Sequence, residues 1–157
     1  MALKIHSFHE SKLRSFEKEI DQVFINNGFK IIEATREEQK KGFDRYLVKN
    51  KKRKLKAEYK SDLRMYDTGN FFIETLSVDT TGKLGWALTS EADILVYYML
   101  NDNELWIIDM NLIKSNIADW TKQYKKKKCW NYGYNSEGLL LPKEIIASLV
   151  KKKFSII

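Results

Sequence analysis

The sequence predicts a single α/β domain in which a central mixed β-sheet is flanked by helices. The chain has 157 residues with 43% hydrophobic side chains, which suits one domain with a core that needs no disulfides. Amphipathic helical patterns alternate along it with short runs of β-branched and aromatic residues. With 7 Gly and 1 Pro, it has no low-complexity linker. We therefore expect residues 1–157 to form one domain with a sheet of about five strands.

An amphipathic helix is predicted to begin near Ser11, because apolar residues recur there at helical spacing. These residues are Leu13, Phe16, Ile20, Val23 and Phe24. Gly28 would end the helix, since glycine readily adopts the left-handed conformation found at helix C-termini. Residues 29–34 are then expected to form a short strand or extended turn, whereas residues 35–42 are charged and have no clear pattern.

A β-hairpin is predicted next. Residues 43–48 and 55–60 both have strand-like composition, and the polar segment 49–54 between them reads as a turn. That turn belongs to the sequence KNKKRKLK, which carries six cations in eight residues. The tip of this hairpin should therefore be strongly basic.

The rest of the chain alternates between strand and helix patterns. Three further strands are expected at residues 71–78, 94–99 and 105–108. The first of them, FFIETLSV, should be central because it is rich in aromatic and β-branched residues. Residues 86–91 suit a short helix or turn, and residues 111–123 have apolar side chains at helical spacing. Pro142 is well placed as the first residue of a terminal helix reaching Val150.

Composition excludes several classes of function. The chain has 28 Lys and Arg against 21 Asp and Glu, so its net charge of +7 favours a polyanionic partner. The single cysteine, Cys129, excludes an intramolecular disulfide or a Cys-rich zinc site. No apolar run approaches the about 18 residues of a membrane span, and no Walker or dinucleotide glycine motif occurs. We expect a cytoplasmic protein without a membrane partner.

The residues with the clearest chemical potential lie on the predicted hairpin. Asp44 opens one strand, and Glu58-Tyr59-Lys60 lies 14 residues later on its partner. Residues two apart in a strand share a face, so Glu58 and Lys60 should point together and pairing should bring Asp44 near them. Carboxylates suit Mg²⁺, and a neighbouring lysine can orient a nucleophile. The alternative is a solvated hairpin face with ordinary ion pairs.

The acid-x-Lys pattern alone is weak, because it also occurs at Glu10-Ser11-Lys12 and Glu38-Gln39-Lys40. Context selects the third occurrence, which lies in a strand-like segment preceded by an acid that opens another. With the further landmarks GFDRYLV, KAEYKSDLR, TGNFFIE, GWALTSEADILVYY and GLLLP, residues 42–142 resemble the PD-(D/E)XK nuclease superfamily, in particular small phage and prophage members. Phe43 stands where the superfamily name has proline.

This resemblance implies a restriction-endonuclease-like fold and a Mg²⁺- or Mn²⁺-dependent DNA endonuclease. Asp44 and Glu58 would bind the ion, the Tyr59 carbonyl would add a ligand, and Lys60 would position the attacking water. In such proteins an acid of the first helix often joins the metal cluster, and Glu17 would match it. A phage protein of this kind would act in the cytoplasm of its host.

Two acidic residues have open roles. Glu17 lies on the apolar stripe of the first helix, three residues before Ile20, so it either needs a cationic partner or reaches water at the stripe edge. Glu74 follows a strongly apolar segment and either reaches the metal site or satisfies a neighbouring Arg or backbone group. Asp93, at a strand start, is expected to be structural.

Two basic clusters are candidate contacts to DNA phosphates. The hairpin tip contributes Lys51, Lys52 and Arg53, and the later sequence KQYKKKK contributes Lys125, Lys126 and Lys127. Both clusters also suit a merely solubilising surface. Arg64 and Asn70, just after the Glu58-Tyr59-Lys60 strand, are further candidates for phosphate or base contacts. The aromatic residues around the second cluster, Tyr124, Trp130, Tyr132 and Tyr134, suit either base stacking or core packing.

Two alternatives to a DNA endonuclease acting on ordinary duplex remain. One is a nucleic-acid-binding or host-interaction protein that has the fold and the basic surface but does not cut. The other is a Holliday-junction-type resolvase, which would be a symmetric homodimer.

Overall fold

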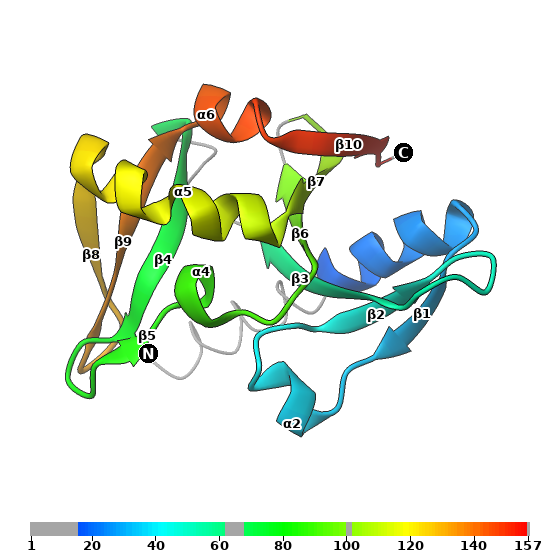
Figure 1. The fold of residues 1–157 in the computed structure, drawn as a ribbon, viewed down its shortest axis with the longest axis horizontal. Helices are drawn as coiled ribbons and strands as arrows, with labels where there is room; N and C mark the ends of the chain where they lie inside the picture. Colours follow the sequence, from blue (N-terminus) through cyan, green and yellow to red (C-terminus); the bar gives the residue numbers. More distant parts are fainter. Residues whose placement is uncertain (1–15, 62–67, 100–101, 157) are drawn as a thin grey trace.

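The computed structural model describes residues 16–61, 68–99 and 102–156, which form a mixed α/β structure with two β-sheets (Figure 1). The larger sheet has six strands in the order β1-β2-β3-β6-β7-β10. They are β1 (Lys30–Glu33), β2 (Arg45–Val48), β3 (Leu55–Ser61), β6 (Ile94–Met99), β7 (Glu104–Asp109) and β10 (Val150–Ser155). The sheet is mixed, because β3 and β6 are parallel whereas the other neighbouring pairs are antiparallel.

The smaller sheet has four antiparallel strands in the order β5-β4-β9-β8. They are β4 (Asn70–Val78), β5 (Lys83–Leu84), β8 (Lys126–Trp130) and β9 (Asn135–Pro142). In Figure 1 this sheet stands beside the larger one, with α5 (Met110–Gln123) running across both. Three shorter helices complete the labelled elements: α2 (Arg36–Gln39), α4 (Trp86–Thr89) and α6 (Lys143–Ala147).

Two hydrophobic cores hold these layers together. A helix over residues 16–26 covers one face of the larger sheet through Ile20, Val23 and Phe24. The other core contains α5 residues such as Ile117, together with Phe71 of the smaller sheet and Tyr97 of the larger one. Because apolar side chains of both sheets meet in this second core, their burial fixes one sheet against the other.

The predicted hairpin is present. Its turn is held by a 3.1 Å hydrogen bond from the Lys52 N–H to the Lys49 carbonyl. Asn50 and Lys51 between them have φ values of 54° and 55°. Two consecutive left-handed residues are typical of the tight turns that join antiparallel strands. The predicted strands at residues 29–34, 94–99 and 105–108 and the helix at 111–123 are also confirmed.

Three predictions about the fold were wrong. Residues 71–78 form β4, which belongs to the smaller sheet and not to the centre of the larger one. The smaller sheet as a whole was not predicted. The terminal helix is only α6, since Pro142 ends β9 and the chain continues as β10. The missed strands β8 and β10 have the sequences KKKCW and VKKKFS. Both are edge strands, where lysine blocks unwanted pairing but hides the apolar pattern.

The charged segment 35–42 contains the short helix α2. Thr35 caps it, because its side-chain oxygen accepts a 3.2 Å hydrogen bond from the Glu38 N–H. This Thr-x-x-Glu spacing is the signature of a capping box. Among the described residues, no helix combines the length and the apolar character needed to cross a membrane.

Candidate active site

The candidate site lies where β2 stops pairing with β3. The last paired residues are Arg45 and Ala57, and the Asp44 N–H donates a 2.8 Å hydrogen bond to the Ala57 carbonyl. Beyond this pair, β2 and β3 are no longer paired in the part of the chain that the structure describes. Instead, the Tyr59 N–H donates to Asp44 Oδ2 at 2.8 Å. Because the N–H and C=O of one strand residue point to the same side, the Tyr59 carbonyl also faces the Asp44 side of β3.

Glu58 and Lys60 share a face of β3, as the sequence predicted. Lys60 Nζ lies 2.7 Å from Glu58 Oε1. The Glu58 side chain is 8% exposed and that of Lys60 is 32% exposed. The Glu58 carboxyl group is also in hydrogen-bonding contact with that of Asp44. Folding therefore brings Asp44, Glu58 and Lys60 together, which is the geometric condition that the candidate chemistry requires.

The electrostatics of this group follow from burial. Burial raises the pKa of Glu58, the Lys60 ammonium partly opposes that rise, and the Asp44 carboxylate adds to it. Burial disfavours the charged form of Lys60, but the carboxylates of Glu58, Asp44 and Glu74 outweigh it and raise the Lys60 pKa. Lys60 therefore stays cationic at neutral pH. It is suited to donate hydrogen bonds or to compensate negative charge, and it is unsuited to accept a proton.

Arg45 was not predicted as a site residue, yet it binds two acidic residues of the first helix beside the site. It is 6% exposed, and its guanidinium group lies 3.3 Å from Glu17 Oε2 and 3.2 Å from Asp21 Oδ1. Asp21 Oδ1 also accepts a 2.9 Å hydrogen bond from the Tyr59 hydroxyl. Of the two alternatives for Glu17, the cationic partner is present in Arg45, and the Glu17 side chain also reaches water, since it is 39% exposed. The signal in the sequence was the spacing of Glu17 and Asp21, which puts both acids on one helix face.

A cavity of about 300 Å³ lies at this site. It is lined by Glu17, Asp44, Glu58, Tyr59 and Lys60, together with Phe16, Ile20 and Ser61. The hydrogen-bonding contact between the Asp44 and Glu58 carboxyl groups is favourable only if a proton or a cation lies between them. The local charges are unbalanced, with four carboxylates against two cations. They are Glu17, Asp21, Asp44 and Glu58 against Arg45 and Lys60.

The donors of this cavity are hard oxygen atoms, which suit Mg²⁺ or Mn²⁺. Within the described parts of the chain, however, no three Asp, Glu, His or Cys side chains are grouped so that they alone would hold a metal ion. A divalent ion at Asp44 and Glu58 would therefore depend on backbone, water or substrate oxygens, as Mg²⁺ commonly does.

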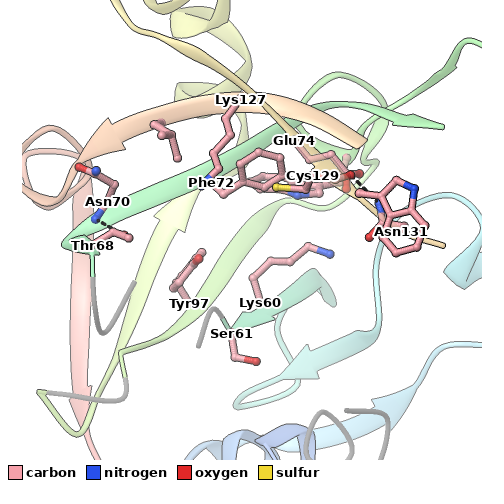
Figure 2. A pocket seen from close by; sticks show the side chains of 13 residues that line it. Lys60, Ser61, Thr68, Asn70, Phe72, Glu74, Tyr97, Lys127, Cys129 and Asn131 are labelled. Atoms are coloured by element: carbon pink, nitrogen blue, oxygen red, sulfur yellow. Dashed lines mark hydrogen bonds between the residues drawn. The ribbon is translucent and has the colours of Figure 1, made fainter. Parts of the chain in front are cut away.

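A second, larger cleft of about 420 Å³ adjoins the first, and Lys60 and Ser61 line both. It lies between the two sheets. Figure 2 shows Lys60, Ser61 and Tyr97 of the larger sheet on one side, with Phe72, Cys129 and Lys127 of the smaller sheet opposite. Glu74 also lines this cleft, where the Lys60 ammonium lowers its pKa and burial raises it more. Glu74 therefore approaches the site from the smaller sheet.

The predicted DNA contacts fall in different places. Asn70, the first residue of β4, lines the cleft between the sheets, as does Lys127 of β8. Lys125 precedes β8, and Lys126 of that strand lies 3.7 Å from Glu137. Arg64 lies outside the described residues.

The hairpin tip is more distant from the acids. Lys51, Lys52 and Arg53 precede Glu58 by at least five residues of extended chain, or about 16 Å at about 3.3 Å per residue. Arg53 pairs with Asp93 at 2.9 Å. Asp93 also accepts a 2.8 Å hydrogen bond from the Lys56 N–H, so its predicted structural role is confirmed.

Comparisons of the chain with protein-family models, with curated proteins and with solved structures return no match. The chemistry of the site therefore has to be argued from the residues that meet there.

Proposed function

We propose that this chain is a metal-dependent DNA endonuclease of the PD-(D/E)XK type. The observation that supports this most directly is the convergence of Asp44, Glu58 and Lys60 where the pairing of β2 with β3 ends in a mixed sheet. Asp44 directly precedes β2, Glu58 and Lys60 lie on the neighbouring β3, and all three line one cavity. An excess of carboxylates at this point of a chain with a net charge of +7 calls for a functional explanation.

Asp44 and Glu58 are the residues that would hold Mg²⁺ or Mn²⁺, with the Tyr59 carbonyl as a further ligand. When bound, such an ion would stabilise negative charge on the phosphate and lower the pKa of a coordinated water. Glu17, which faces the same cavity, is held by Arg45 and acts on the site through its charge. It would become a ligand only by exchanging that partner.

Lys60 would serve as the hydrogen-bond donor and the positive charge of the site. Because its neighbours keep it protonated, it can donate a hydrogen bond that orients the attacking water or a phosphate oxygen. Its positive charge also offsets the negative charge that accumulates on the phosphate during attack. In the overall reaction, water adds to phosphorus, one phosphorus–oxygen bond breaks, and the departing oxygen gains a proton. The basic surface would hold the DNA strand through its phosphates.

Purified protein incubated with DNA in Mg²⁺ or EDTA tests this proposal. The substrates are linear duplex, a four-way junction, single-stranded DNA and RNA. We expect Mg²⁺-dependent DNA cleavage that is lost in Asp44→Asn, Glu58→Gln and Lys60→Met. Matched controls are Asp119→Asn and Lys122→Met, which change exposed residues of α5. These two variants should cleave as the parent does.

Binding without cleavage in every Mg²⁺ lane would overturn the nuclease proposal and leave a nucleic-acid-binding protein. Cleavage that survives in Asp44→Asn and Lys60→Met would show that these residues do not carry the reaction. Preferential cutting of the four-way junction by a species sedimenting as a dimer would identify a resolvase.

A further inference from the structure

We infer that the cleft between the two sheets receives a nucleotide whose base is unpaired, so that the enzyme prefers DNA with single-stranded or extrahelical bases over continuous duplex. This inference rests on the proposed function, because the cleft opens onto the same Lys60 and Ser61 that line the acidic cavity. A base in the cleft would place its own phosphate beside Asp44 and Glu58.

The walls of the cleft suit a flat aromatic ring. Phe72 of the smaller sheet lies opposite Tyr97 of the larger one (Figure 2), and Leu140 of β9 and Trp86 of α4 also line the cleft. Asn70 and Asn131 add amide groups toward opposite ends of the cleft (Figure 2), where they can pair with the polar edge of a base. The volume of about 420 Å³ lies in the range of small-ligand sites, about 300–1,000 Å³.

Trp130 lines the cleft and is paired with the neighbouring ring of Tyr132. Trp130 is 66% exposed and Tyr132 is 57% exposed, and their ring centroids are 4.8 Å apart. Core packing therefore does not explain them. The turn that presents them is well ordered by hydrogen bonds, since the Asn131 N–H donates to the Tyr134 carbonyl at 2.7 Å and Asn131 Nδ2 donates to Ser136 Oγ at 3.1 Å. Exposed, positioned aromatic rings are what stacking with unpaired bases requires.

The charges of the cleft suit a DNA backbone. Lys60 and Lys127 line it from the two different sheets. Lys127 and Cys129 of β8 line the cleft, whereas Lys128 between them does not. Lys127 can therefore bind a phosphate next to the apolar walls that would contact the base.

A paired base cannot use these walls, because its two faces are covered by its neighbours in the duplex stack. A base in a single strand, a bulge or a flap has free faces at little cost, since its pairing and stacking are already broken. The cleft therefore discriminates by the accessibility of the base and not by sequence.

Fluorescence of 2-aminopurine tests this inference. The probe base is placed as a single-base bulge in a duplex, or paired within the same duplex, and binding is measured in EDTA so that no cleavage occurs. The wild-type chain should bind the bulged probe about tenfold more tightly than the paired probe, and binding should change the fluorescence of the bulged 2-aminopurine. Trp130→Ala should lose about tenfold in affinity for the bulge, the loss expected for about 1.4 kcal/mol of base stacking.

Lys127→Ala and Lys128→Ala form the matched pair, because they remove the same charge from neighbouring positions of one strand. Lys127→Ala should weaken binding of the bulged probe several times more than Lys128→Ala. Equal affinity for bulged and paired probes, or unchanged binding by Trp130→Ala, would overturn the inference while leaving the Asp44→Asn cleavage assay to judge the nuclease. A clear preference for the bulge with no cleavage in Mg²⁺ would instead overturn the nuclease proposal alone.

Discussion

The Asp44 carboxylate accepts a 2.8 Å hydrogen bond from the Tyr59 backbone N–H. The pairing of β2 with β3 ends at Arg45 and Ala57, so this side chain supplies the acceptor that a further paired residue of β2 would have supplied. One carboxylate oxygen thus satisfies a backbone N–H of β3 between Glu58 and Lys60, whose side chains project into the site. The same side chain contacts Glu58, so the end of the β2–β3 pairing and the candidate chemistry share one residue.

Substitutions at Asp44 should therefore separate stability from activity. Asp44→Ala removes the acceptor for the Tyr59 N–H and should lower the free energy of unfolding by about 1–3 kcal/mol. Asp44→Asn retains an oxygen acceptor and relieves repulsion with Glu58, so its stability should lie within about 1 kcal/mol of wild type. Both variants should lose about 100-fold or more in cleavage rate, since metal binding supplies several kcal/mol of transition-state stabilisation.

Urea unfolding of both variants, with exposed Asp119→Ala as the control, gives the stabilities. Equal destabilisation by Asp44→Ala and Asp44→Asn would argue against the strand-completing role. Full activity in Asp44→Asn would argue against its role as a metal ligand.

Arg45 should be important for stability without touching substrate. Arg45→Met would leave the carboxylates of Glu17 and Asp21 without their shared cation and should cost about 3 kcal/mol of unfolding free energy. Arg53→Met breaks an ion pair whose arginine is 78% exposed and should cost less than about 1 kcal/mol. Chemical unfolding of the two variants compares a buried arginine of β2 with an exposed arginine of the turn between β2 and β3. A similar cost for both would show that Arg45 does not anchor the first helix to β2.

The hairpin and its three candidate residues could be predicted because the signals are local. Strand alternation alone puts Glu58 and Lys60 on one face, and pairing in a short hairpin limits where Asp44 can lie. The smaller sheet could not be predicted in the same way. Its strand β8 is KKKCW, in which lysines serve an edge strand and leave no apolar run. The cleft between the sheets arises only from long-range packing, so no sequence pattern could assign Trp86, Tyr97 and Phe72 to one cavity.

Stability at acidic to neutral pH should report on Glu74. Burial raises its pKa above the ordinary value of 4.5, although Lys60 and the Trp86 backbone N–H oppose the rise. Above pH 4.5 the native state therefore binds more protons at Glu74 than the unfolded state does. The contribution of this group to stability is fully present below pH 4.5 and is lost as pH rises through the raised pKa.

Glu74→Gln removes this titration but keeps an oxygen that can accept from Trp86. The unfolding free energy of Glu74→Gln minus that of wild type should therefore increase as pH rises above 4.5, and then level off. Other titrating groups occur in both proteins and cancel in the difference. A difference for Glu74→Gln that is flat or falls with pH would contradict the burial of this carboxyl group.

Thermal unfolding with Mn²⁺ in the absence of DNA should separate metal binding from catalysis. An ion that binds only the folded chain stabilises it by about 2.7 kcal/mol at 100 times its dissociation constant, which corresponds to a rise in Tm of about 5–10 °C for a domain of this size. Wild type and Asp119→Asn should show this rise, and EDTA should reverse it. Asp44→Asn and Glu58→Gln should show little of it.

Lys60→Met gives the sharpest test of the arrangement. Lys60 Nζ lies 2.7 Å from Glu58 Oε1 and therefore competes with a metal ion for that oxygen. Removing the ammonium group should increase the Mn²⁺-dependent rise in Tm above that of wild type, while cleavage is lost because no cation orients the water or the phosphate. A smaller rise than in wild type would mean that Lys60 supports metal binding instead of competing with it. Retained cleavage would mean that the water is oriented by another group, which would remove Lys60 from the mechanism.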